Sequence, residues 1–132
     1  VQYAHKANWV MAIEIDSKAV EWAKKVWPLP NVEWVKQDIC DVQVQPLFDT
    51  ILCIEVLEHT GDPERAMANL RALLRPGGTA WISVPRGQTR NELHKFAWTE
   101  ETLEADLREH FSHVKIDHKW PTLFLAECSN NA

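Results

Sequence analysis

This sequence lacks long hydrophobic runs and any excess of positive charge. No apolar stretch among its 132 residues approaches the length of a membrane span, and its start carries no signal-peptide pattern. We therefore expect a cytoplasmic protein without membrane association. The formal net charge of −5 provides no basic field that would attract nucleic acid. This disfavours duplex binding, although contact with a single nucleotide at a strand end stays open.

Cysteine is scarce, and repeats and linkers are absent. Cys40, Cys53 and Cys128 form an odd set without the spacing of metal ligands, and two of them fall in or beside predicted strands. This usage predicts core thiols in a reducing cytoplasm. Hydrophobic residues make up 45% of the chain, which is ordinary for a globular protein. With no repeat, low-complexity tract or linker, residues 1–132 are predicted to form a single domain.

The most informative stretch runs from Phe48 to Pro85. Residues 48–54 form a short apolar run rich in strand formers. Asp62 then provides an N-cap and Pro63 a first helical residue, and Pro76-Gly77-Gly78 predicts the helix end, with Arg75 at the negative end of its dipole. One apolar stripe at helical spacing consists of Ala66, Met67, Leu70, Leu73 and Leu74. Residues 80–84 read as a second strand, so the stretch predicts a strand–helix–strand crossover.

The remaining elements extend this pattern to both sides. Further strands are predicted at residues 9–15, 32–36, 114–118 and 122–128. Asp16 and Ser17 begin a helix that Pro28 ends, and Thr99 caps another helix with Leu103, Leu107 and Phe111 as its inner side. The last two strands follow each other closely and predict an antiparallel pair at the sheet edge. The fold class is therefore α/β, a Rossmann-like, mostly parallel sheet with an antiparallel C-terminal strand pair.

Four short segments of this stretch carry a resemblance to a known family. These are the FD that opens residues 48–54, EVLEH directly after them, RPGG before the next strand and ISVP along it. In this the chain resembles the class I S-adenosylmethionine-dependent methyltransferases, and it is similar to quinone-biosynthesis O-methyltransferases and small-RNA 2′-O-methyltransferases. The likeness extends from Trp9 to about Cys128.

One feature of that family is missing here. The family begins with a strand and a glycine-rich turn, whereas all glycines of this chain follow residue 60. The fold implied is therefore N-terminally truncated, and the absent strand would lie between residues 9–15 and 48–54. Unpaired strand edges are unfavourable, so these two strands pair with each other, or another chain fills the gap, or the sequence is part of a longer protein. We favour truncation with compensation by association, which implies a homo-oligomer that completes the sheet.

The resemblance implies a binding surface for S-adenosylmethionine at the strand ends. Glu14 would accept hydrogen bonds from the ribose hydroxyls, and Ile15 would pack on the adenine. Asp38 would accept from the adenine amino group, and the backbone of Ile39 would donate to the ring. The family's methionine-binding backbone corresponds to Ile54 and Glu55. The alternatives are that Glu14 is a solvated strand end and that Asp38 is a turn residue, and Asp16 is the second choice for the ribose contact.

Two carboxylates and two imidazoles are expected at one rim of the sheet. Residues 55–59 follow the predicted strand at 48–54 and include Glu55, Glu58 and His59. His94 follows the next predicted strand. These side chains are suitable ligands for Mg²⁺ or Mn²⁺. In small-RNA 2′-O-methyltransferases an EVxEH segment and a later HxFxWT segment supply such a metal site, and residues 94–99 here read HKFAWT. The alternative is a metal-free catalytic rim in which His59, His94 and Glu58 handle a proton.

These observations lead to one main functional expectation and two alternatives. The main one is an enzyme, or part of one, that moves a methyl group from S-adenosylmethionine to a small molecule, onto oxygen. The second is a non-catalytic remnant of the fold that acts by association, which the missing glycine turn favours. The third is metal-dependent 2′-O-methylation of an RNA 3′ end. Arg86 and Arg90 could contact an anionic substrate or serve as solvated loop cations.

Overall fold

The computed structural model describes residues 4–43, 47–87 and 93–131. The chain divides into two compact units, Val1–Val42 and Gln43–Ala132, and each is described by itself below. Whether they act as the one domain expected from the sequence stays a prediction. Among the described residues, no helix combines the length and apolar character that crossing a bilayer demands.

The first unit is a two-stranded parallel sheet with one helix. Strands β1 (Val10–Glu14) and β2 (Val32–Lys36) pair from Val10 opposite Val32 to Glu14 opposite Lys36. Helix α1 (Ser17–Val26) connects them and begins where Asp16 accepts a hydrogen bond from the Lys18 amide at 2.8 Å. Short 3₁₀ helices η1 (Ala4–Lys6) and η2 (Ile39–Asp41) flank the pair. The predicted strands and helix are confirmed to within a residue or two.

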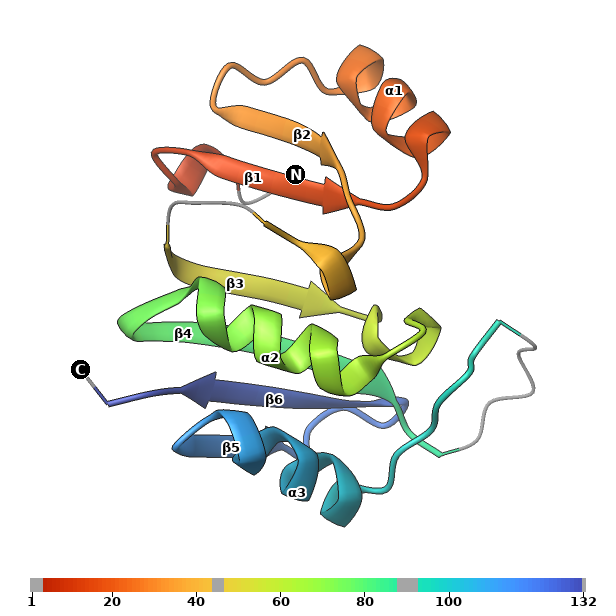
Figure 1. Ribbon diagram of the computed structural model, residues 1–132, viewed down its shortest axis with the longest axis vertical. Helices are drawn as coiled ribbons and strands as arrows, with labels where there is room; N and C mark the ends of the chain where they lie inside the picture. The colour runs from red at the N-terminus through yellow and green to blue at the C-terminus, as the bar shows by residue number, and fades with distance from the viewer. Residues whose placement is uncertain (1–3, 44–46, 88–92, 132) are drawn as a thin grey trace. The chain divides into compact units, whose positions relative to one another are not determined.

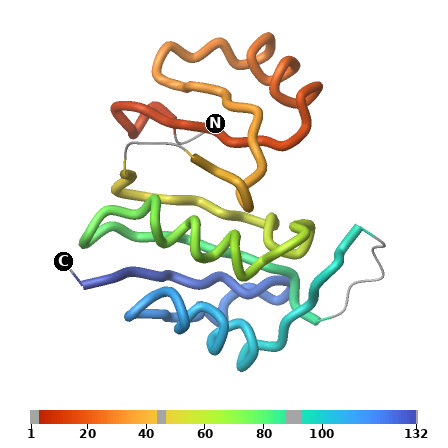
Figure 2. The backbone as a smooth tube through the Cα atoms, viewed as in Figure 1, coloured from red at the N-terminus to blue at the C-terminus, as the bar shows by residue number. Residues whose placement is uncertain are grey.

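The second unit contains a four-stranded mixed sheet. Strands β3 (Phe48–Ile54), β4 (Leu74–Pro85), β5 (His113–Asp117) and β6 (Leu123–Ser129) lie in the order β3-β4-β6-β5. The pair β3–β4 is parallel, and β6 runs antiparallel to both of its neighbours. The backbone tube in Figure 2 shows β6, the last strand of the chain, lying beside β4. The antiparallel pair predicted at the C-terminal edge is therefore confirmed.

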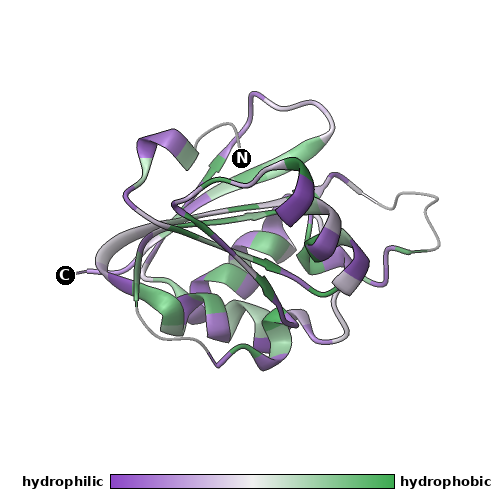
Figure 3. Ribbon diagram, turned by 90° about the horizontal axis from the view of Figure 1, so that it is seen from above, coloured by the Kyte–Doolittle hydropathy of each residue, from purple (hydrophilic) through white to green (hydrophobic). Residues whose placement is uncertain are grey.

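Two helices cover one face of this sheet. Figure 1 shows α2 (Pro63–Leu73) and α3 (Glu100–His110) on the same side. The Asp62 side chain caps α2, and Thr99 with Thr102 forms a capping box at α3. The predicted apolar stripes are buried, and apolar side chains of β4 and β6 face them: Ala80, Ile82, Val84, Phe124, Ala126 and Cys128. Figure 3 shows the resulting alternation of hydrophobic and hydrophilic residues around the helices.

The connection between α2 and β4 differs from the prediction. The helix ends at Leu73, and β4 begins at Leu74 and includes the Pro-Gly-Gly segment that we expected to be a loop. The register shifts there, from Phe48 opposite Leu74 to Thr50 opposite Thr79. Arg75 lies two residues after the helix end, and its Nη1 donates to Asp49 Oδ1 of β3 at 2.9 Å. Residues 75–78 have no partner on β3 within this register shift, and Gly77 has a positive φ of 75°, so the predicted turn is present as an irregularity inside β4.

The strands that flank the expected gap belong to different sheets. β1 pairs with β2, and β3 lies at the edge of the four-stranded sheet beside β4. β1 belongs to the first unit and β3 to the second, so the three options for the gap stay predictions. Leu52 and Ile54 on β3 are 61% and 47% exposed, which is high for apolar residues of a predicted buried strand.

Candidate active site

The candidate site forms where β3 ends. Glu55 follows the strand and has a positive φ of 55°, and the 3₁₀ helix η3 (Leu57–His59) begins two residues later. Glu58 on η3 is only 1% exposed, although glutamate rarely lies inside a protein. The backbone carbonyl of Glu58 accepts a hydrogen bond from the Lys95 amide at 2.8 Å. The segment after residue 92 is thereby fixed against η3, which brings His94 to Glu58 as the sequence predicted.

The His59 ring is oriented by a backbone carbonyl. His59 Nδ1 lies 3.1 Å from the Leu93 oxygen. Because a carbonyl oxygen can only accept, Nδ1 must carry the hydrogen, and the lone pair of the neutral ring then lies on Nε2. That Nε2 atom lies 3.7 Å from Oε1 of Glu58. The ring of His94 packs edge-on against the His59 ring, with 4.6 Å between the ring centres.

The Glu58 carboxylate is in an unusual electrostatic environment. Both of its oxygens are buried, and no other residue in the described part of the chain donates a hydrogen bond to them. Burial raises the pKa of the Glu58 carboxyl above its ordinary value of 4.5, and the charge of Glu55 adds to the rise, while His59 and His94 oppose it. A buried acceptor without a donor is costly, so Glu58 is a group that would gain from a proton or a cation.

Three of the four predicted metal-ligating residues converge. Ligand atoms of Glu58, His59 and His94 all lie within 4.8 Å of one another. Atoms bound to one ion at about 2.1 Å lie roughly 3–4 Å apart, so small side-chain shifts would suffice for coordination. Glu55 is not a member of this group, and its Oε1 accepts a hydrogen bond from Ser83 Oγ at 3.0 Å.

Ser83 is a site residue that sequence reasoning missed. It lies on β4 opposite Ile54, and it is 1% exposed although it is polar. The signal was present in the sequence as a single hydroxyl within the apolar run from Trp81 to Val84. Reading that run as a buried strand without asking where the hydroxyl finds a partner concealed its contact with Glu55.

The carboxylates expected to bind adenosine lie in the first unit. Glu14 ends β1 and Asp38 follows β2, so parallel pairing places them at the same edge of one sheet. Each orders its own loop: Glu14 Oε1 accepts from the Asp16 amide at 2.9 Å, and Asp38 Oδ1 accepts from the Cys40 amide at 2.8 Å. The turn role considered for Asp38 is therefore present. The hydrogen bond to the Cys40 amide uses Oδ1 and does not involve Oδ2.

The other expected cofactor residues divide between the units. Ile15 is 60% exposed at the end of β1, and Ile39 lies on η2 directly after Asp38. Ile54 and Glu55 lie in the second unit, at the end of β3. The cofactor-binding roles expected from the sequence stay predictions for all six residues: Glu14, Ile15, Asp38, Ile39, Ile54 and Glu55.

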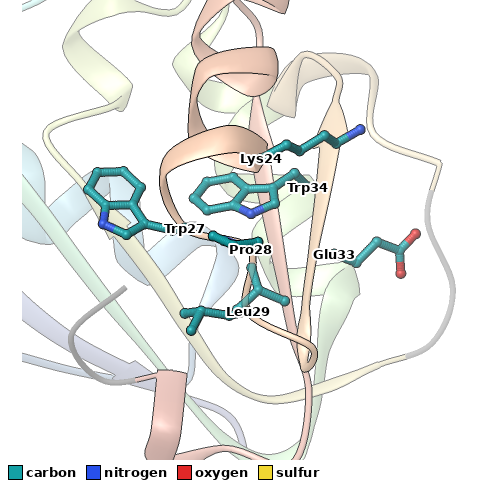
Figure 4. Close-up of a pocket in the computed structure, with 7 residues that line it drawn as sticks. Lys24, Trp27, Pro28, Leu29, Glu33 and Trp34 are labelled. Atoms are coloured by element: carbon teal, nitrogen blue, oxygen red, sulfur yellow. The ribbon is translucent and has the colours of Figure 1, made fainter.

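A hollow of about 400 Å³ in the first unit lies away from those carboxylates (Figure 4). It lies against the first half of β2, whereas Glu14 and Asp38 lie at strand ends. The rings of Trp27 and Trp34 stack there with centres 6.4 Å apart. Lys24, Pro28, Leu29, Val32 and Glu33 complete the lining. Its residues match none of the roles expected from the sequence.

The basic loop after β4 is only partly described. Arg86 Nε donates to the Leu123 carbonyl at 3.1 Å, and its guanidinium carbon lies 4.6 Å from the centre of the Phe124 ring. These contacts give Arg86 a structural role beside β6. Arg90, the other cation considered for an anionic substrate, lies outside the described residues.

Comparison with known proteins decides the family. Residues 1–82 match the family model described as "Methyltransferase domain", which is more than half of the chain. The chain belongs to this methyltransferase domain family. The resemblance inferred from EVLEH and RPGG is thereby confirmed.

Curated relatives of this methyltransferase domain include two named proteins. Nodulation protein S of Azorhizobium caulinodans is 31% identical over 95 residues, which cover 70% of this chain and 46% of that protein. A ubiquinone biosynthesis O-methyltransferase of Coxiella burnetii is 50% identical over 37 residues, or 28% of this chain and 16% of that protein. The chain thus spans about half the length of the first relative and less of the second.

Solved structures confirm the fold. The N-methyltransferase NodS from Bradyrhizobium japonicum WM9 matches with a TM-score of 0.74 and 22% identity, over 94% of this chain and 74% of that one. At this identity the likeness establishes the Rossmann-like methyltransferase fold.

Proposed function

We propose that this methyltransferase domain transfers the methyl group of S-adenosylmethionine to a hydroxyl oxygen of a small molecule. The observation that carries the proposal is the buried Glu58 carboxylate beside His59 and His94, directly after β3. In open α/β sheets the carboxyl ends of the strands are where ligands bind. A proton acceptor at this position suits an acceptor group that must lose a proton, as a hydroxyl must.

The hydrogen-bond acceptors of the first unit fit the cofactor. Ribose hydroxyls and an adenine amino group are hydrogen-bond donors, and the carboxylates of Glu14 and Asp38 at one sheet edge are acceptors. Glu14 would bind the ribose and Asp38 the amino group, with the exposed Ile15 side chain against the adenine ring. When bound, the cofactor supplies an electrophilic methyl group on a positively charged sulfur.

His59 is the residue we assign to the proton. The hydroxyl proton of the acceptor would pass to His59 Nε2 as the hydroxyl oxygen takes the methyl group that the bound cofactor would supply. The Leu93 carbonyl keeps the ring in the tautomer whose Nε2 can accept that proton. Glu58, 3.7 Å from Nε2, stabilises the imidazolium that forms, and His94 packs against the same ring.

Names of the relatives agree on methyl transfer and differ on the acceptor. One curated relative is named an O-methyltransferase, and the NodS structure is named an N-methyltransferase. The position of a base at the rim supports oxygen, because an alcohol needs deprotonation during attack whereas a neutral amine does not.

Calorimetry with S-adenosylhomocysteine tests the proposal. We expect the chain to bind with a dissociation constant near micromolar and Glu14→Ala to weaken binding about tenfold, the loss of one to two charge-assisted hydrogen bonds. Glu21→Ala removes the same charge from the exposed side of α1 and should leave affinity unchanged. Absence of heat at high ligand concentration would contradict the proposal. It would support the alternative of a fold that acts by association, which sedimentation would then examine.

A second candidate is that the same three side chains bind a divalent ion. The convergence of Glu58, His59 and His94, together with a buried carboxylate that lacks a donor, favours it. The carbonyl on Nδ1 of His59 is also the outer contact that metal-bound histidines usually make. An ion there would lower the pKa of the acceptor hydroxyl. Its presence would favour the alternative of 2′-O-methylation of an RNA 3′ end, which an RNA methylation assay would test.

Chelation separates the two versions. With a bound ion, activity should fall at least tenfold after EDTA treatment, recover with Mg²⁺ or Mn²⁺, and disappear in His94→Ala. In the metal-free version, EDTA has no effect. Manganese titration followed by calorimetry provides a readout that needs no substrate, and His113→Ala serves as the control because His113 lies on the edge strand β5.

A further inference from the structure

Glu55 has a backbone conformation that glutamate rarely adopts. Among the described residues it is the one non-glycine residue with positive φ, at 55°. Side chains other than glycine are strained in this left-handed region, because Cβ crowds the following carbonyl. Such strain persists only where surrounding contacts hold it, and it gathers at functional sites.

Among the described residues, Ser83 supplies contacts of this kind. The Glu55 amide donates to the backbone oxygen of Ser83 at 3.1 Å and also points to its side-chain Oγ at 3.2 Å. The Ser83 hydroxyl in turn donates to Glu55 Oε1 at 3.0 Å. Ser83 therefore binds both the backbone and the side chain of Glu55. Because Ser83 is 1% exposed and lies within the β4 ladder, it can hold Glu55 rigidly.

The conformation of Glu55 determines where the next residues go. Three residues after Glu55 comes Glu58, and His59 follows at the end of η3. We propose that Ser83 is a positioning residue of the active site, which locks Glu55 in the left-handed conformation and thereby places Glu58 and His59. The Glu55 carboxylate accepts the hydrogen bond of this lock and is not a member of the cluster of Glu58, His59 and His94. The link to catalysis rests on the proposed function, whereas the lock itself does not.

A double-mutant cycle tests the lock without any ligand. Ser83→Ala should raise the unfolding equilibrium constant about tenfold in urea titrations, the effect of one lost hydrogen bond to a charged group. In the Glu55→Gly background, Ser83→Ala should change the unfolding equilibrium constant less than about threefold, because glycine adopts positive φ without help and offers no carboxylate. Thr122→Ala removes an exposed hydroxyl of the same unit and should have no effect. Equal fold-changes of Ser83→Ala in both backgrounds would overturn the proposal.

A spectroscopic readout tests the positioning. In nitrogen-15 spectra, His59 should show the signature of the tautomer protonated on Nδ1, because that nitrogen faces the Leu93 carbonyl. Ser83→Ala should shift His59 toward a mixture of tautomers, and Thr122→Ala should not. An unchanged His59 signature in Ser83→Ala would show that the hydroxyl serves stability alone. Neither measurement depends on cofactor binding, so failure of the calorimetric test leaves this proposal standing, and the reverse also holds.

Discussion

Glu58 shows how one buried residue can make stability depend on pH. Its carboxyl has a raised pKa in the folded chain because of burial, so the folded state binds its proton more tightly than the unfolded state does. The stabilisation is therefore fully present below the ordinary value of 4.5, and it is lost as pH rises through the folded pKa.

We expect this pH dependence to disappear in Glu58→Gln. The wild-type free energy of unfolding should fall relative to the variant as pH rises above 4.5, because the wild type must bury a charge that glutamine lacks. Urea titrations of both chains between about pH 4 and 8 measure the difference. A constant difference across this range would show that the carboxyl is not held against ionisation. Glu109→Gln, on the exposed side of α3, provides the control.

At the scale of elements, the junction between α2 and β4 depends on one close approach. A Cβ on Gly78 would lie 2.9 Å from the Asp49 oxygen and 2.9 Å from Leu74 Cδ1, with the Arg75 oxygen at 3.0 Å. Two of these contacts are with backbone atoms, which cannot move aside. The register shift between β3 and β4 thus requires a residue without a side chain at this position.

Gly78→Ala should therefore destabilise the chain by about 1–3 kcal/mol, the usual cost of forcing extra atoms into a packed site. Gly61→Ala is the matched control, because no atom lies within 4 Å of the added carbon. Its effect should stay within about 0.5 kcal/mol. Similar losses in the two variants, measured by urea unfolding, would mean that backbone entropy and not crowding explains the glycine at 78.

Most elements were predictable because their local signals agree. Strands β2 and β3 match the predicted residues, and the caps at Asp62 and Thr99 are confirmed. The start of β4 at Leu74 was not predictable, because its pairing with Phe48 depends on a residue 26 positions earlier. The predicted Pro76-Gly77-Gly78 turn lies within the strand as a register shift with a positive φ at Gly77.

At the scale of the whole molecule, the sequence predicted which side chains lie together in the cluster but not which hydrogen bonds position them. Glu58, His59 and His94 converge as expected, because parallel strand order brings successive loops to one edge. The exclusion of Glu55 was unforeseeable, since it depends on a hydroxyl 28 residues away and on a backbone angle that no composition reveals. Assignment to two sheets likewise follows from long-range pairing and not from any single stretch.

The place of β6 in the sheet has a consequence for biosynthesis. This strand is the last one described, yet it lies between β4 and β5 and hydrogen-bonds to both. While the ribosome still holds residues 123–129, β4 and β5 have no partner between them, so the sheet of the second unit cannot close. Its final assembly must wait until these residues have left the ribosome.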